Sequence, residues 1–262
     1  MKIKTAVSGG ILLLSVFAHG PALAGSGTEA ASPGDFNPEQ KELAIASGID
    51  FAKMKFDKGV HIVPLEDSQF VGPLADDMAR SILEQKEKGF HTVANVRVPD
   101  LRQAVLKSGP DVGGDARIPM RRFASTSDVR PGLLAEPRSI VGTQLESARF
   151  VEATTAGGLK EGKWTGLSRV FDVAGLGLVV FDEVDYVASE ASITVIEEWI
   201  NVDVNGHPGI AKTARSEDGR TLVSVAWTTD RFSLSLMLQP TYPVNIESNQ
   251  QALLAMAQDI GD

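Results

Sequence analysis

The second half of the chain is a series of short apolar segments separated by turn-forming residues, and this pattern constrains the fold more than any other feature. Apolar and polar residues alternate most regularly over 223–228 and 232–239. Alternation with a period of two is typical of β-strands that bury one face. The pattern predicts seven strands after Ser139, over 145–155, 165–174, 176–187, 192–204, 209–216, 220–228 and 231–239.

The links between these strands are short and contain residues that tolerate tight turns. Asn205-Gly206 is typical of a two-residue hairpin, Glu217-Asp218-Gly219 supplies a polar turn, and Thr229-Asp230 separates the last two strands. Such close spacing favours an antiparallel meander. After the last strand, Ser248 and Gln251 match a capping box. We therefore expect a C-terminal helix that packs its apolar stripe on the sheet.

The first half of the chain has a helical pattern instead. A helix is predicted over 73–88, ended by Gly89, followed by a strand over 90–98 and a short helix that begins at Asp100. Residues 109–138 have no regular period and contain several prolines and glycines, which indicates a long connection or a boundary. We predict an α+β protein: a helix-rich part, an irregular connection, and an antiparallel β-meander sheet with a C-terminal helix packed on it, over 37–108, 109–138 and 139–262.

The N-terminus has the pattern of a cleavable secretory signal peptide over 1–24. Lys2 and Lys4 precede an uncharged apolar stretch, and Ala22-Leu23-Ala24 supplies the small residues that signal peptidase requires. The apolar stretch is too short to cross a membrane. We expect cleavage between Ala24 and Gly25, a flexible lead over 25–36, and a periplasmic or secreted product without a transmembrane segment. The chain has no cysteine, which excludes a disulfide framework.

The composition is acidic, and this narrows the partners. The formal charge is −9, and it becomes −11 when Lys2 and Lys4 are removed with the signal. Binding to nucleic acid depends on clustered Lys and Arg that neutralise phosphates, so we expect none. The densest basic patch has two interpretations. It is a docking site for an acidic partner or an anionic group, or it is a solvated linker. Its residues are Arg117, Arg121, Arg122 and Arg130.

No known catalytic or metal-binding motif is present. The sequence lacks a G-x-S-x-G elbow, a Walker loop, an H-E-x-x-H helix and a dinucleotide fingerprint. Asp182-Glu183-Val184-Asp185 is acidic, but adjacent strand residues point to opposite faces. We therefore expect no cofactor, no metal and a non-catalytic role, with an exported hydrolase assembled only in the fold as an alternative. That hydrolase would draw on Asp182, Asp185 or His207, whereas the spacing of the histidines does not suit a metal site: His61, His91 and His207.

One region of the second half resembles a known class of bacterial proteins. The segments are 202–209 with its Asn-Gly turn, Asp218-Gly219-Arg220, and Val225-Ala226-Trp227 before a final helix. Together they resemble the extracytoplasmic modules of bacterial envelope-stress regulators and their lipoprotein-sorting relatives. That resemblance implies a partly open antiparallel sheet that binds a lipid, a lipoprotein or a partner protein. The helical first half has no counterpart in those modules, so no binding residue is transferred.

These observations favour an exported, non-catalytic binding or regulatory protein of the bacterial envelope. Its partner would be another envelope protein or a lipid-like ligand. The hydrolase is one alternative. The other is an immunity or inhibitor protein, which would use its acidic surface to mask a basic effector.

Overall fold

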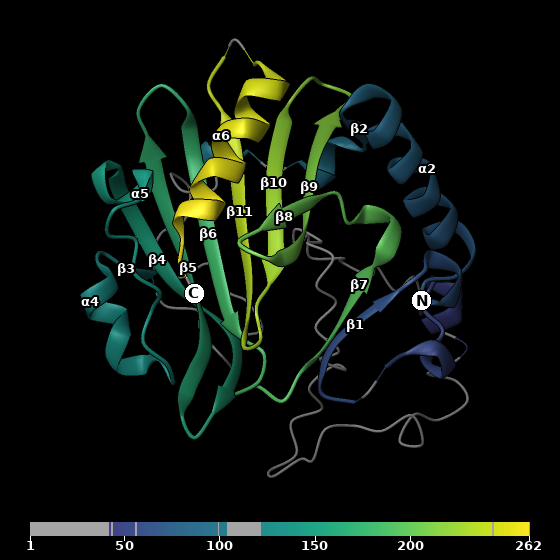
Figure 1. Ribbon diagram of the computed structural model, residues 1–262, viewed down its shortest axis with the longest axis horizontal. Helices are drawn as coiled ribbons and strands as arrows, with labels where there is room; N and C mark the ends of the chain where they lie inside the picture. The colour runs from purple at the N-terminus through teal and green to yellow at the C-terminus, as the bar shows by residue number, and fades with distance from the viewer. Residues whose placement is uncertain are drawn as a thin grey trace, which may run out of the picture.

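The computed structural model describes residues 42, 44–55, 57–98, 100–103, 122–242 and 244–261. Within them the chain forms an α+β fold, a mostly antiparallel sheet with the C-terminal helix packed on it, as the sequence predicts (Figure 1). The predicted signal peptide, the lead over 25–36, and Arg117 and Arg121 lie outside the described residues.

A nine-stranded sheet forms the centre of the molecule, in the order β2-β9-β10-β11-β6-β5-β4-β3, with β8 paired to β9. All neighbours are antiparallel except β2 and β9, which run parallel. The strands are β2 (His91–Val93), β3 (Arg122–Phe123), β4 (Arg149–Lys160), β5 (Lys163–Val173), β6 (Gly177–Asp185), β8 (Val202–Val204), β9 (His207–Ser216), β10 (Thr221–Thr228) and β11 (Phe232–Pro240).

The sheet consists of two meanders joined side by side. β4, β5 and β6 form one, β9, β10 and β11 form the other, and β6 pairs with β11. β7 (Ser192–Ile196), which follows β6 in the chain, leaves the sheet and pairs in parallel with β1 (Gly59–Val63). The single strand expected over 192–204 is therefore wrong. The 3₁₀ turn η6 (Glu197–Trp199) interrupts it because the buried Trp199 turns into an apolar cluster with α2.

The alternation in β10 and β11 has the expected consequence. Val225 lies opposite Leu236 in the register, and Trp227 lies opposite Leu234. All four side chains belong to one buried cluster, together with the apolar residues of the C-terminal helix α6 (Ile246–Asp259). Figure 1 shows α6 lying across this face of the sheet. The period of two thus placed the core on the correct face.

The C-terminal helix begins earlier than its capping box suggests. The side chain of Asn245 accepts a hydrogen bond from the backbone N–H of Ser248 at 3.0 Å, so Asn245 is the N-cap and Ser248 lies inside the helix. Asn and Ser are about equally good N-caps, so residue type alone does not distinguish Asn245 from Ser248. The expected apolar stripe is buried as predicted: Leu253, Met256, Ala257 and Ile260.

The helix-rich part shares its strands with the second half. Helix α2 (Gly72–Lys88) ends at Gly89 in the left-handed conformation, as predicted. The strand expected over 90–98 is wrong beyond β2, because the chain then forms the 3₁₀ turn η4 (Asn95–Arg97). Pairing of β1 with β7 and of β2 with β9 ties this part to residues after 139. Other short helices among the described residues include η2 (Phe51–Lys53), η3 (Leu65–Asp67), α4 (Thr126–Val129), η5 (Arg130–Gly132) and α5 (Gln144–Ser147).

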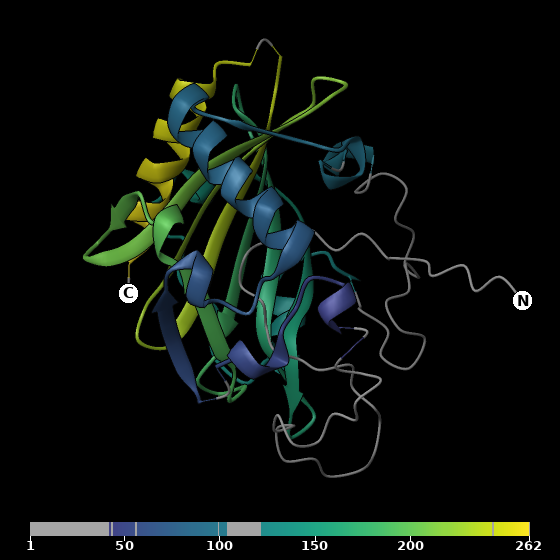
Figure 2. The ribbon, with the colours of Figure 1, turned by 90° about the vertical axis from the view of Figure 1, so that its right-hand side faces the viewer.

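The face of the sheet opposite α6 is covered by the first half of the chain. Val98 and Leu101 pack on an apolar cluster that includes Val180 and Met237. Figure 2 shows α6 and the turn at 101–103 on opposite sides of the sheet. Beside this cluster, α2 packs near the β9 edge around Trp199. No helix within the described part of the chain has the length and apolar character needed to cross a bilayer.

Candidate functional site

A cavity of about 340 Å³ opens at the end of the sheet where β10 begins and β11 ends. This volume lies at the lower end of the range for small-molecule sites. Three segments that are distant in sequence meet there: 100–102, 220–221, and 239–242 with Val244. The lining residues are Asp100, Arg102, Arg220, Thr221, Gln239, Pro240, Thr241, Tyr242 and Val244.

The first wall of the cavity is anchored by two buried apolar side chains. Val98 is fully buried and Leu101 is 7% exposed, both against the sheet face opposite α6. The backbone N–H of Arg102 also donates to Oε1 of Gln239 at 3.3 Å. Because Leu101 points into the core, its neighbours Asp100 and Arg102 are left at the cavity.

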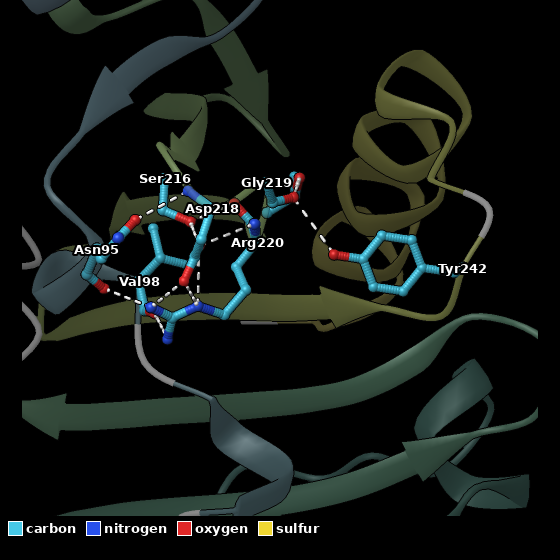
Figure 3. Close-up of polar contacts among 8 residues, drawn as sticks. Asn95, Val98, Ser216, Asp218, Gly219, Arg220 and Tyr242 are labelled. Carbon is cyan, nitrogen blue, oxygen red and sulfur yellow. Dashed lines mark hydrogen bonds and ion pairs between the residues drawn. The ribbon is translucent and has the colours of Figure 1, made fainter.

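Arg220 clamps this wall to the turn between β9 and β10. Its Nη1 donates to the carbonyl of Val98 at 2.5 Å, and its Nη2 donates to the carbonyl of Asn95 at 2.9 Å. Its Nε and Nη2 also contact Asp218, with Nε 2.9 Å from Oδ2 and Nη2 2.8 Å from it. Figure 3 shows this guanidinium reaching from the turn to Asn95 of η4 and to Val98.

Asp218 receives hydrogen bonds from both sides and balances the charge of Arg220. The Arg220 guanidinium, with help from the hydroxyl of Ser216, lowers the pKa of the Asp218 carboxyl to about 2. The same contacts raise the pKa of Arg220 above its ordinary value. The backbone N–H of Asp218 donates to Oδ1 of Asn95 at 2.9 Å. The pair is therefore charged over the physiological range, and it holds the first wall in place.

Tyr242 forms the opposite rim. Its hydroxyl donates to the carbonyl of Gly219 at 3.3 Å, so the side chain spans from the end of β11 to the turn (Figure 3). The residue is still 73% exposed. A large exposed aromatic ring beside a cavity is typical of a surface that contacts a ligand.

Asp100 and Arg102 are the charged groups at the cavity with the most freedom to bind. Oδ1 of Asp100 accepts the backbone N–H of Gln103 at 3.0 Å, an N-cap contact that leaves its second oxygen without a partner among the described residues. Arg102 is exposed, and no carboxylate in the described part of the chain pairs with its guanidinium. One side of the cavity thus offers both an acceptor and a donor.

No sequence motif identifies these residues as a site. The sequence predicts Asp100 at the start of a helix and Asp218 in a turn, without a site between them. The spacing Asp100-Leu101-Arg102 holds opposite charges on either side of a buried residue, which is a detectable but weak signal.

The predicted arginine patch is described only in part. Arg122 lies in β3 and donates to Oε2 of Glu152 at 2.6 Å, and the pKa of Glu152 is raised by burial. Arg130 lies in η5 and forms an exposed ion pair with Glu136 at 3.0 Å. Both described members therefore have acidic neighbours within this region, and a shared anion site stays a prediction.

The residues of the alternative hydrolase are not brought together. Asp182 lies on the face opposite α6 between Ser168 and Ser235, whereas Asp185 lies three positions along β6 and contacts Arg231 at 2.7 Å. His207 is in the β8–β9 hairpin, and two strands separate β9 from β6. Burial raises the pKa of Asp182 to about 6, with hydrogen bonds from the two serines acting against that shift.

The acidic end of β6 is largely buried. Glu183 and Asp185 are 3% and 0% exposed, and Asp182 is half-buried. Glu183 pairs with the buried Arg169 of β5 at 2.8 Å, a partner that lies 14 residues earlier and becomes its neighbour through the hairpin. Among the described residues, no group of three or more His, Asp or Glu side chains is arranged to hold a metal ion.

The geometry of the cavity is thus the main evidence about function, and comparisons with known proteins add no relative. No family model, curated protein or solved structure matches this chain. The resemblance to extracytoplasmic envelope modules stays a prediction based on the turn and strand motifs.

Proposed function

We propose that the chain is an exported, non-catalytic binding protein of the bacterial envelope that holds a small polar ligand in the cavity between residues 100–102, 220–221, 239–242 and 244. The observation that carries the proposal is the cavity itself. Its volume of about 340 Å³ suits a small molecule, and its lining combines charged, amide, hydroxyl and aromatic groups.

The hydrogen bonds that fix the cavity wall support a binding role for the cavity. Arg220 and Asp218 use most of their hydrogen-bonding groups to fix the first wall to the turn. Holding a site in its final geometry before the ligand arrives reduces the entropy lost on binding. Asp100 and Arg102 keep binding capacity beyond these internal contacts.

The residues that line the cavity restrict the ligand to fewer chemical classes than the sequence alone does. A lipid tail needs an enclosure that is apolar throughout, whereas this cavity combines apolar surface with charged, amide and hydroxyl groups. The proposal therefore replaces the lipid-like ligand expected from the sequence with a small polar molecule.

Native mass spectrometry of the mature protein, purified gently from its own compartment, tests this proposal. We expect an added small-molecule mass. Thr241→Trp, which puts a large side chain into the cavity lining, should remove it. Asp230→Trp is the matched control, because Asp230 is exposed in the β10–β11 turn at the other end of β10.

Two results would contradict the proposal. One is a bare protein that also binds no small molecule in a thermal-shift screen. The other is an adduct that survives Thr241→Trp as well as it survives Asp230→Trp, because the ligand would then lie elsewhere.

A further inference from the structure

The cavity presents one positive and one negative side chain that form no ion pair within the described part of the chain, although the Asp100 carboxylate is close enough to Arg220 to help raise the pKa of that guanidinium. Arg220 is largely neutralised by Asp218, which contacts both its Nε and its Nη2. Asp100 and Arg102 remain, two positions apart on the same wall. Their shared wall is rigid because Val98 and Leu101 are buried in the core behind it.

Three kinds of small ligand differ in how they meet this pair. An anion would pair with the Arg102 guanidinium but would lie beside the like charge of the Asp100 carboxylate. A cation would pair with Asp100 but would lie beside the like charge of Arg102. Desolvating a charge beside a like charge costs free energy, and each of these ligands also covers one unpaired protein charge. A ligand with both charges satisfies both groups through charge-assisted hydrogen bonds.

The rest of the lining is suited to an apolar group. Pro240, Val244 and the ring of Tyr242 lie along the part of the cavity formed by the last residue of β11 and the segment that follows it. The hydroxyl of Tyr242 is already bound to the carbonyl of Gly219, so the ring is held at the rim. An apolar substituent of a ligand would therefore contact the ring and not the hydroxyl.

We propose that the cavity binds a small zwitterion, a free amino acid with an apolar side chain, whose carboxylate contacts Arg102 and whose ammonium contacts Asp100. This inference rests on the binding function proposed above and adds the ligand class. The amino acid's apolar side chain lies against Tyr242, Pro240 and Val244.

Isothermal titration calorimetry with three matched probes tests the ligand class: L-phenylalanine, 3-phenylpropanoate and phenethylamine. The last two each lack one charged group of the first. Since hydrogen bonds to charged groups are stronger than those between neutral groups, we expect L-phenylalanine to bind at least about tenfold more tightly than either analogue. L-leucine, a second apolar amino acid, is titrated in parallel.

Two variants assign the charges to their residues. Asp100→Asn keeps the cap on Gln103 and removes the negative charge, so the advantage of L-phenylalanine over 3-phenylpropanoate should disappear. Arg102→Gln should remove its advantage over phenethylamine. Glu87→Gln and Lys163→Gln, at exposed positions of α2 and β5, are the charge-matched controls and should leave all affinities unchanged.

The outcomes separate the ligand class from the binding function. Equal binding of L-phenylalanine and 3-phenylpropanoate overturns the zwitterion, and so does an equal loss of all three probes in both variants. If neither amino acid binds while mass spectrometry shows an adduct that Thr241→Trp removes, the ligand class is wrong and the binding function stands. If no adduct is found and no probe binds, the binding function itself is wrong.

Discussion

Replacing Arg169 with methionine should destabilise the fold far more than its distance from the cavity suggests. Arg169 is 2% exposed, donates to Oε1 of Glu183 at 2.8 Å and to the carbonyl of Arg138 at 3.0 Å, and lies over the ring of Phe181. Removing one member of a buried ion pair typically costs about 3–5 kcal/mol, because the other charge stays buried without a partner. Since domains of this size are stable by about 5–15 kcal/mol, the loss is a large share of the total.

A second arginine in the same sheet provides the control. Arg149 pairs with Asp172 at 2.7 Å, nearly the same distance, but its side chain is 69% exposed. Exposed pairs contribute about 0–1 kcal/mol, so Arg149→Met should lower the free energy of unfolding by no more than that. Urea denaturation of both variants measures the difference. The double variant Arg169→Met/Glu183→Leu should recover much of the loss, because no unpaired buried charge is left.

The pH dependence provides a further check on the cause. Burial raises the pKa of Glu183 above its ordinary value even though Arg169 lowers it, and losing Arg169 removes that opposing effect. A folded state with a raised carboxyl pKa binds protons more readily than the unfolded state, so stability is gained as pH falls. The deficit of Arg169→Met should therefore shrink as pH falls toward 4.5, the ordinary value for Glu. Equal losses for Arg169→Met and Arg149→Met, or a deficit independent of pH, would refute this reasoning.

Three further predictions address other parts of the fold. Asn245→Ala should lower the free energy of unfolding, measured by urea denaturation, by about 1 kcal/mol, while Ser248→Ala should change it by less than about 0.5 kcal/mol. The reverse order would show that Ser248 is the N-cap. Asp182→Asn should stabilise the protein by about 3 kcal/mol at neutral pH but not near pH 4, because the wild type loses stability as pH rises from 3.8 to about 6; a gap that does not change between these pH values contradicts this. Arg220→Gln should lower the local opening free energy of the segment around Asn95 and Val98 by about 1–3 kcal/mol, which hydrogen exchange would detect as faster exchange there. Unchanged exchange would show that Val98 and Leu101 suffice as anchors.

The structure also relates stability to the site. Arg220 acts through the wall it holds, whereas Asp100 and Arg102 face the cavity directly. A variant of Arg220 is therefore expected to weaken ligand binding and local stability together. Variants of Asp100 and Arg102 are expected to change ligand preference without a comparable change in stability, which separates the positioning residue from the contacting ones.

Local patterns in the sequence determined the elements of this fold. Alternation in 223–228 and 232–239 predicted two strands and their buried face, because side chains on a strand point alternately to its two sides. Asn205 and Gly206 both adopt positive φ in the β8–β9 turn, as the hairpin signal requires. Gly89 ends α2 for the same reason. Each of these features depends on the backbone preferences of a few neighbouring residues.

The arrangement of those elements was decided only in three dimensions. Alternation says which face of a strand is apolar but not which strand lies beside it, so the pairing of β6 with β11 and of β7 with β1 could not be predicted. The Arg169–Glu183 pair and the cavity depend on these pairings. Residues 100–102, 220–221, 239–242 and 244 meet because β10 begins where β11 ends and because Val98 and Leu101 dock the first half of the chain on the sheet. Contacts between distant segments follow from the global packing of apolar surface, and local sequence carries little information about them.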